Sequence, residues 1–276
     1  MVLNSEESYL FDSDMKTQHK LICGDAIDEL KKIPSNSIDL VFADPPYGLA
    51  KKKGLGWAYS KHITLQEEWD IFTKDSFFKF NQDWLAECVR VTKHGGSLWV
   101  CGSFHNIYQI GFILQHFHDL KTNNSIVWFK PNAQPNITCR FFTESTEHLI
   151  WASKNGDGKK WTFNYELMKS MNGGKQMRNV WEIPLTPRRE KWAGEHPTQK
   201  PLELLKRIIL ACTNESEHET VLDPFVGSGT TCVAAKMLGR NSIGIDREQK
   251  YIDIAKKRLN PPQKMLNELT EVVEAH

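Results

Sequence analysis

A short apolar run that ends in an acid, two prolines and an aromatic residue constrains this chain more than any other stretch. Residues 38–43 read Ile-Asp-Leu-Val-Phe-Ala, too short for a helix and rich in β-formers, so they predict a buried parallel strand. Neither Pro45 nor Pro46 can donate to a ladder, so the strand must end at Asp44. The Asp44 carboxylate and the fixed Pro45 carbonyl can each accept a hydrogen bond from a planar –NH₂ group, and the Tyr47 ring can stack on its plane. An ordinary turn after a strand is the alternative interpretation.

A second motif lies near the C-terminus. Residues 220–231 read Thr-Val-Leu-Asp-Pro-Phe-Val-Gly-Ser-Gly-Thr-Thr, which predicts a strand, a glycine loop and the start of a helix. Glycines at a helix N-terminus allow a carboxylate or phosphate to approach the backbone. The loop is not a P-loop and lacks the full dinucleotide pattern. However, Asp246 ends the following strand about twenty residues later, where an acid can bind ribose hydroxyls. A carboxylate-binding loop and a ribose-binding acid together suit S-adenosylmethionine.

Strand and helix patterns alternate along most of the chain, which favours an α/β fold with a largely parallel sheet and helices on both faces. Strands are predicted at residues 20–26, 38–43, 97–102, 125–131, 147–152 and 241–246 and from residue 220. Helices are predicted at residues 26–33, 72–93, 107–117, 202–212 and 251–259 and from the glycine loop to Leu238.

The length of 276 residues fits one large domain with an insertion or two small domains. The alternation of strands and helices breaks between residues 154 and 194. We therefore expect five parts: a leader (1–17), a catalytic half (18–153), an inserted target-recognition region (154–194), a cofactor-binding half (195–260) and a tail (261–276).

Basic side chains are concentrated in two segments, although the net charge of the whole chain is only +1. Residues 154–194 carry nine basic against four acidic side chains, together with tryptophans and amides, a combination that suits phosphate contacts and base readout. Residues 49–62 have lysines, glycines and no acid, which suits a flap over a phosphate backbone. A solvated surface is the alternative for both. The candidate DNA-binding residues are Lys51, Lys52, Lys53, Arg178, Arg188, Arg189 and Lys191.

Composition indicates in which cellular compartment such a chain would work. The sequence has no apolar run long enough to cross a bilayer and no basic segment followed by an apolar stretch at its N-terminus. Its six cysteines include no C-x-x-C pair and no histidine beside them to complete a zinc site. We therefore expect a cytoplasmic protein with reduced thiols, no membrane partner and no metal.

These motifs together resemble the β class of amino-group DNA methyltransferases, over roughly residues 20–259. Residues 44–47 match the catalytic Asp-Pro-Pro-Tyr of that family, and residues 223–231 match its cofactor loop. Residues 196–201, His-Pro-Thr-Gln-Lys-Pro, match the short motif before that loop, and residues 179–184 resemble its lead-in. The resemblance implies a doubly wound, mostly parallel seven-stranded fold that binds S-adenosylmethionine, with both motifs at the carboxyl ends of neighbouring strands.

The resemblance also implies roles for individual residues. Asp44, Pro45, Pro46 and Tyr47 would be catalytic. Asp25 would face the adenine of the cofactor, although capping of a helix is its alternative role, and Asp246 would bind the ribose. The implied cofactor-binding set is Asp25, Ala26, His196, Thr198, Lys200, Asp223, Phe225, Gly227, Ser228, Gly229, Thr230 and Asp246.

The resemblance implies methyl transfer to a base flipped out of double-stranded DNA. An Asp at position 44 favours adenine N6 as the target, so the leading hypothesis is an adenine-specific methyltransferase of a bacterial restriction–modification system. A cytosine-N4 methyltransferase and a non-catalytic DNA-binding relative are the alternatives. A cognate restriction endonuclease and a second copy of the chain are the protein partners that this hypothesis allows.

Overall fold

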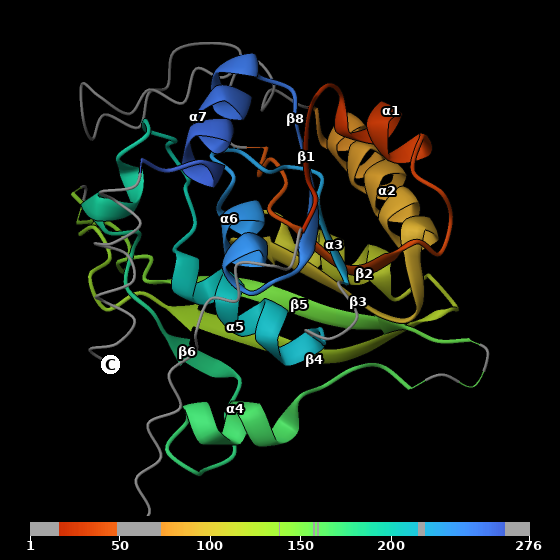
Figure 1. Cartoon of the computed structure of the whole chain (residues 1–276). Helices are drawn as coiled ribbons and strands as arrows, with labels where there is room; N and C mark the ends of the chain where they lie inside the picture. The colour runs from red at the N-terminus through yellow and green to blue at the C-terminus, as the bar shows by residue number, and fades with distance from the viewer. Residues whose placement is uncertain are drawn as a thin grey trace, which may run out of the picture.

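The structure of the protein is a computed structural model that describes residues 17–48, 73–137, 139–156, 158, 160–214 and 219–262 (Figure 1). All but the last residue of the predicted leader, and most of the predicted tail, lie outside the described residues. The strands are β1 (His19–Cys23), β2 (Ile38–Ala43), β3 (Thr92–Gly102), β4 (Leu120–Phe129), β5 (Thr146–Lys154), β6 (Val180–Glu182), β7 (Thr220–Asp223) and β8 (Asn241–Asp246). The helices are α1 (Ala26–Lys31), α2 (Lys74–Val91), α3 (Ile107–Leu114), α4 (Tyr165–Met171), α5 (Leu202–Cys212), α6 (Thr230–Met237) and α7 (Gln249–Leu259), with a 3-10 turn at Arg188–Lys191.

One sheet runs through the described residues in the order β1-β8-β7-β2-β3-β5-β4-β6. Every neighbouring pair is parallel except the two that involve β5, which runs antiparallel to β3 and β4. The doubly wound, mostly parallel fold is confirmed. The described sheet has eight strands where the resemblance implied seven, because the short strand β6 adds to its edge beside β4.

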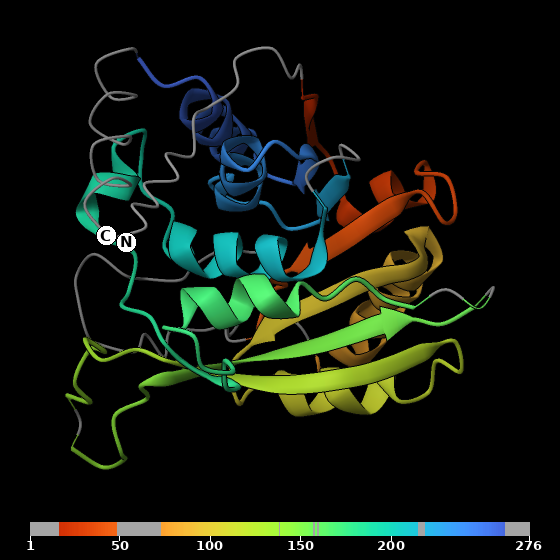
Figure 2. The same ribbon diagram turned by 60° about the horizontal axis from the view of Figure 1, so that its bottom comes forward.

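The strands alternate between two apolar layers, as expected for strands buried on both faces. Leu40 and Phe42 of β2 point into a core formed with α4, α5 and α6, whereas Val41 and Ala43 point into a core formed with α1, α2 and α3. Figure 2 shows α4 and α5 side by side over one face of the sheet and α3 beneath the other. A sheet covered on both faces leaves its edges and the carboxyl ends of its strands as the places for a site.

The predicted insertion is tied into this architecture. Its α4 buries Met168, and its β6 buries Trp181, whose Nε1 donates to the Arg178 carbonyl at 2.9 Å. Lys154, at the start of the segment, is buried and donates to the carbonyls of Val89 and Thr92. Part of the aromatic and basic content of this segment therefore serves the fold.

None of the helices within the described ranges combines the length and apolar character needed to cross a membrane. All six cysteines are free thiols.

Candidate active site

The two sequence motifs follow neighbouring strands of the sheet. Strands β2 and β7 are parallel, with Leu40 opposite Val221 and Val41 opposite Leu222. Asp44 follows the end of β2, and the glycine loop follows the end of β7. The prediction that these motifs meet at one edge of the sheet is confirmed by this register.

The Asp44 carboxylate is held on both oxygens. The Tyr47 hydroxyl donates to Oδ1 at 2.8 Å, and the Lys200 ammonium donates to Oδ2. Lys200 also lies 5.7 Å from the centre of the Tyr47 ring. The resemblance placed Lys200 in the cofactor pocket, and the structure places its ammonium group on the Asp44 carboxylate.

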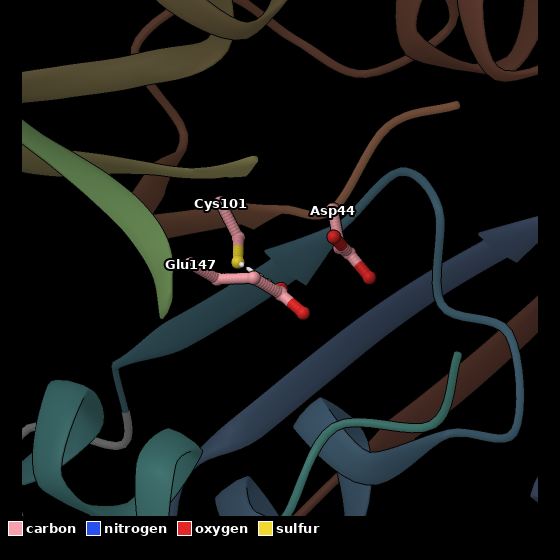
Figure 3. A group of neighbouring side chains, drawn as sticks. All are labelled: Asp44, Cys101 and Glu147. Carbon is pink, nitrogen blue, oxygen red and sulfur yellow. Dashed lines mark hydrogen bonds between the residues drawn. The ribbon is translucent and has the colours of Figure 1, made fainter. Parts of the chain in front are cut away.

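A second carboxylate, Glu147, completes this group, although no sequence motif pointed to it. The Tyr47 hydroxyl also reaches Glu147 Oε2 at 3.2 Å, and Lys130 donates to Oε1 at 3.1 Å. Figure 3 shows Glu147 beside Asp44, with the Cys101 thiol against it at 3.5 Å. Glu147 reaches this edge because β5 runs antiparallel to β3, which brings the beginning of β5 next to the end of β3, at the edge where β2 also ends.

The electrostatics of this cluster follow from its burial and its two ammonium groups. Burial raises the pKa of Asp44, and the charge of Lys200 only partly offsets that effect. Burial also acts to raise the pKa of Glu147, but Lys200 and Lys130 together outweigh it and lower that pKa. Burial disfavours the charged form of Lys200, yet Asp44 and Glu147 raise its pKa above the usual value. The structure therefore holds an ammonium group between two carboxylates, with Glu147 the more readily ionised.

Ligand atoms of Asp44, Cys101 and Glu147 all lie within 4.8 Å of one another, close enough for a shared metal ion. However, both carboxylates already contact ammonium groups, and a cation would have to displace them. The donor set therefore suits an ion-pair network better than a metal centre.

Contacts from α7 stabilise the conformation of the glycine loop. Gly227 and Gly229 have φ values of +50° and +84°, and a Cβ at Gly229 would lie 2.6 Å from the Ala255 Cβ. The buried side chain of Arg258 on α7 donates from Nη1 to the Ser228 carbonyl at 2.9 Å and to the Thr230 hydroxyl at 2.8 Å. Arg258 was not predicted, since a basic residue late in a helix usually only complements the helix dipole.

The Asp246 carboxylate also stabilises the glycine loop. Its Oδ2 accepts from the Gly227 backbone N–H at 3.0 Å, and its Oδ1 accepts from the Glu248 N–H at 2.8 Å. The side chain is half-buried, and burial raises the pKa of Asp246. Each carboxylate oxygen has a second lone pair, so these two bonds leave capacity for ribose hydroxyls.

Asp223 and Phe225 differ in their surroundings. Asp223 is buried, and its oxygens accept from the Phe225 N–H at 2.9 Å and from the Thr231 hydroxyl at 2.5 Å. Burial raises the pKa of Asp223 to about 7. Its bonds thus fix the turn between β7 and the glycine loop. The partly exposed Phe225 ring packs edge-on against Trp84, with centroids 5.3 Å apart.

The remaining predicted cofactor residues surround the loop. Asp25 caps α1 by accepting from the backbone N–H groups of Ile27 and Asp28, which confirms the capping role. It follows β1, whose Cys23 lies opposite Asp246 in the sheet. Ala26 is buried at the start of α1. His196 lies near the glycine loop, since a Cβ at Gly227 would lie 3.0 Å from its Nε2. The Thr198 backbone N–H donates to His196 Nδ1 at 3.3 Å.

Four of the candidate DNA-binding residues belong to the described part of the chain. Arg178, Arg188 and Arg189 are exposed, and Lys191 is half-buried. Glu190 anchors the 3-10 turn that carries three of them, because its Oε2 accepts from the Leu202 N–H at 3.0 Å and its carbonyl accepts from Gln199. Lys51, Lys52 and Lys53 lie outside the described residues.

Comparisons with known proteins give matches along most of the chain. A family model described as DNA methylase matches residues 38–257. The chain is 48% identical over 242 residues to the Type II methyltransferase M2.LlaDCHI of Lactococcus lactis subsp. cremoris, a match that covers 87% of this chain and 88% of that relative. It is 46% identical over 246 residues to the Type II methyltransferase M2.DpnII of Streptococcus pneumoniae, covering 88% of this chain and 90% of that relative.

Solved structures share the fold. The crystal structure of the M1.HpyAVI–SAM complex superposes with a TM-score of 0.65 at 29% identity, covering 88% of this chain and 100% of that chain. The cytosine-N4-specific PvuII DNA methyltransferase superposes with a TM-score of 0.69 at 18% identity, covering 95% of this chain and 94% of that chain. At 18% identity, the second likeness concerns the fold alone.

Proposed function

Because the chain belongs to the DNA methylase family, we propose that it methylates adenine N6 at a specific site in double-stranded DNA. The chain is an S-adenosylmethionine-dependent DNA methyltransferase. The choice of adenine rests on Asp44, the residue type that the family resemblance associates with that base. The Type II relatives support the further proposal that it is the modification enzyme of a bacterial restriction–modification system.

The residues around the glycine loop fit the cofactor. Gly227 and Gly229 keep the loop free of side chains, Asp246 retains acceptor capacity, and Phe225 offers the edge of an aromatic ring beside the loop. Asp25 lies at the same edge and would take the adenine end, while Thr230, His196 and Thr198 would close the methionine end. When bound, S-adenosylmethionine supplies a methyl group on a positively charged sulfur.

The observation that carries the proposal is the position of Asp44 at the end of β2, beside the glycine loop that follows β7. Asp44 and the Pro45 carbonyl would accept the two hydrogen bonds of an exocyclic amino group. These bonds would draw its lone pair out of conjugation and aim it toward the loop. The protein therefore contributes position and electrostatic stabilisation. A non-catalytic relative would be expected to lack the carboxylate or the loop, and this chain has both.

The test is product analysis. Purified protein is incubated with S-adenosylmethionine and DNA of mixed sequence, the DNA is digested to nucleosides, and the products are separated by mass spectrometry. We expect N6-methyladenine from the wild type and none from Asp44→Ala. N4-methylcytosine alone would replace adenine by cytosine as the substrate, and unmethylated DNA would refute the proposed function.

The exposed Arg178, Arg188 and Arg189, with Lys191, support a role for residues 154–194 in target recognition. We propose that these side chains contact phosphates beside the site, and that Lys51, Lys52 and Lys53 contribute further contacts. Under this proposal the protein works in the bacterial cytoplasm with a cognate endonuclease, and light scattering of the purified protein tests whether it forms a homodimer.

A further inference from the structure

Asp44 would not meet a target base as a free carboxylate. One of its oxygens accepts from Tyr47 and the other from the Lys200 ammonium. Both side chains of the ion pair are largely buried, with 13% of Asp44 and 7% of Lys200 exposed. If Asp44 binds the target amino group, the strong contact from Lys200 competes with it.

A second acceptor for Lys200 lies within reach. Glu147 Oε2 is 3.6 Å from Lys200 Nζ and 3.2 Å from the Tyr47 hydroxyl. Its other oxygen is fixed by Lys130 at 3.1 Å, which holds the carboxylate in place. Lys200 therefore lies between two carboxylates and can transfer from one to the other with a small side-chain movement.

We propose that Glu147 is a positioning residue that takes over the Lys200 ammonium when the target amino group binds Asp44. This proposal rests on the proposed function and deepens it. Glu147 acts through Lys200 and Tyr47 and does not itself touch the base.

The charge changes during methyl transfer explain why the Lys200 ammonium group would move from Asp44 to Glu147. The nitrogen lone pair forms the new N–C bond while the electron pair of the C–S bond returns to sulfur, so positive charge moves to the nitrogen. That nitrogen then loses a proton to Asp44, from which it passes to water. An ammonium group held on Asp44 would oppose the developing charge, since like charges disfavour each other at short range. When Glu147 holds the Lys200 ammonium group, the Glu147 carboxylate neutralises its charge and keeps it farther from the nitrogen.

General damage to the fold is the competing explanation for a slow Glu147 variant, and pH dependence separates the two. The titratable groups that face Glu147 are Asp44, Tyr47, Cys101, Lys130 and Lys200. Glu147 raises the pKa of Asp44, and Lys200 lowers it. Loss of Glu147 should therefore move the acid limb of the rate profile to lower pH, and loss of Lys200 should move it to higher pH. General damage to the fold would not give opposite shifts.

The experiment compares Glu147→Gln, Lys200→Met and the double variant in single-turnover methylation of DNA across a range of pH. We expect Glu147→Gln to slow the transfer by at least about tenfold while the dissociation constants of S-adenosylmethionine and DNA stay within about threefold. The double variant should be no slower than the slower single variant, because both changes act on one contact. Glu203→Gln breaks an exposed ion pair on α5 and serves as the matched control with the wild-type rate.

Two measurements keep the proposal testable if Glu147→Gln folds poorly. Glu147→Asp retains the carboxylate and should give an intermediate rate. NMR titration of the Asp44 carboxyl carbon reports the opposite pKa shifts without any activity. A wild-type rate in Glu147→Gln, multiplicative losses in the double variant or an unshifted acid limb would overturn the proposal while leaving the proposed function intact. A wild-type protein that methylates no DNA would refute both the proposed function and the proposed role of Glu147.

Discussion

Replacement of Arg258 by methionine should weaken cofactor binding, because Arg258 supports the glycine loop from α7. Arg258 Nη1 donates to the Ser228 carbonyl, the Ser228 hydroxyl at 3.0 Å and the Thr230 hydroxyl. It is 4% exposed, so no water can easily replace these bonds. Methionine fills similar space but donates nothing, and the glycine loop then loses its support from α7.

The expected size of the effect follows from these hydrogen bonds. Hydrogen bonds to a charged group contribute about 1.5–3 kcal/mol each, so the two N–H groups of Nη1, which serve all three acceptors, set an upper limit of roughly 3–6 kcal/mol. Burial lowers the pKa of Arg258 from its usual value to about 10. That shift corresponds to about 3 kcal/mol of desolvation, which methionine would relieve. We therefore expect the free energy of unfolding to fall by up to about 3 kcal/mol, and affinity for S-adenosylmethionine to fall by at least about tenfold as the loop loses order.

The matched control is Arg240→Met. Arg240 is 3% exposed and donates to Thr213 and to the Leu238 carbonyl, away from the glycine loop. Urea denaturation and calorimetric titration with S-adenosylmethionine, both at a temperature where each variant is folded, separate stability from binding. We expect both variants to lose stability and only Arg258→Met to lose affinity. Unchanged affinity in Arg258→Met, or an equal loss in both, would refute this reasoning.

Asp44, the basic turn at residues 188–191 and the buried Asp223 at the end of β7 each give a further test. Asp44→Ala should abolish methyl transfer and leave the dissociation constant of S-adenosylmethionine within a fewfold, measured by calorimetry; full activity would remove Asp44 from the mechanism. Replacing Arg188, Arg189 and Lys191 by glutamine should make the salt dependence of DNA binding shallower by about 0.9 for each phosphate that is no longer neutralised, and an unaltered slope would mean that they bind no phosphate. Burial raises the pKa of Asp223 to about 7, so the folded state keeps a proton that the unfolded chain loses near pH 3.8. Raising the pH from about 4 to about 7 should therefore lower the free energy of unfolding by up to about 4 kcal/mol through this group, and Asp223→Asn should remove that part of the pH dependence in urea denaturation.

The parts of the fold that depend on local pattern could be predicted. The apolar run at residues 38–43 and the glycine loop after β7 each specify a strand that ends abruptly, because prolines stop one and glycines turn the other. The parallel neighbours of β2 and the covering helices follow from the alternation of patterns. The short strand β6 and helix α4 were not predicted, because three and seven residues give too little periodicity to detect.

Only half of the cluster around Asp44 was predicted, for a topological reason. Residues 147–152 were identified as a strand, but nothing local to that strand gives its direction. In a parallel strand Glu147 would lie at the far edge of the sheet, away from Asp44. The antiparallel pairing of β5 with β3 places Glu147 close to Cys101 and Tyr47 instead. Direction is a property of the whole sheet, so a single acid before an apolar run carries no sign of its role.

Lys200 shows why a motif match does not by itself assign chemistry. Its segment precedes α5 and was grouped with the cofactor loop because the family resemblance implies that role. Glu190 and Gln199 fix that segment against the turn that carries Arg188 and Arg189. From this position the Lys200 side chain reaches Asp44, which precedes it by 156 residues. One short segment therefore connects the turn that carries Arg188 and Arg189 to the Asp44 carboxylate, and no local pattern in the sequence indicates this long-range contact.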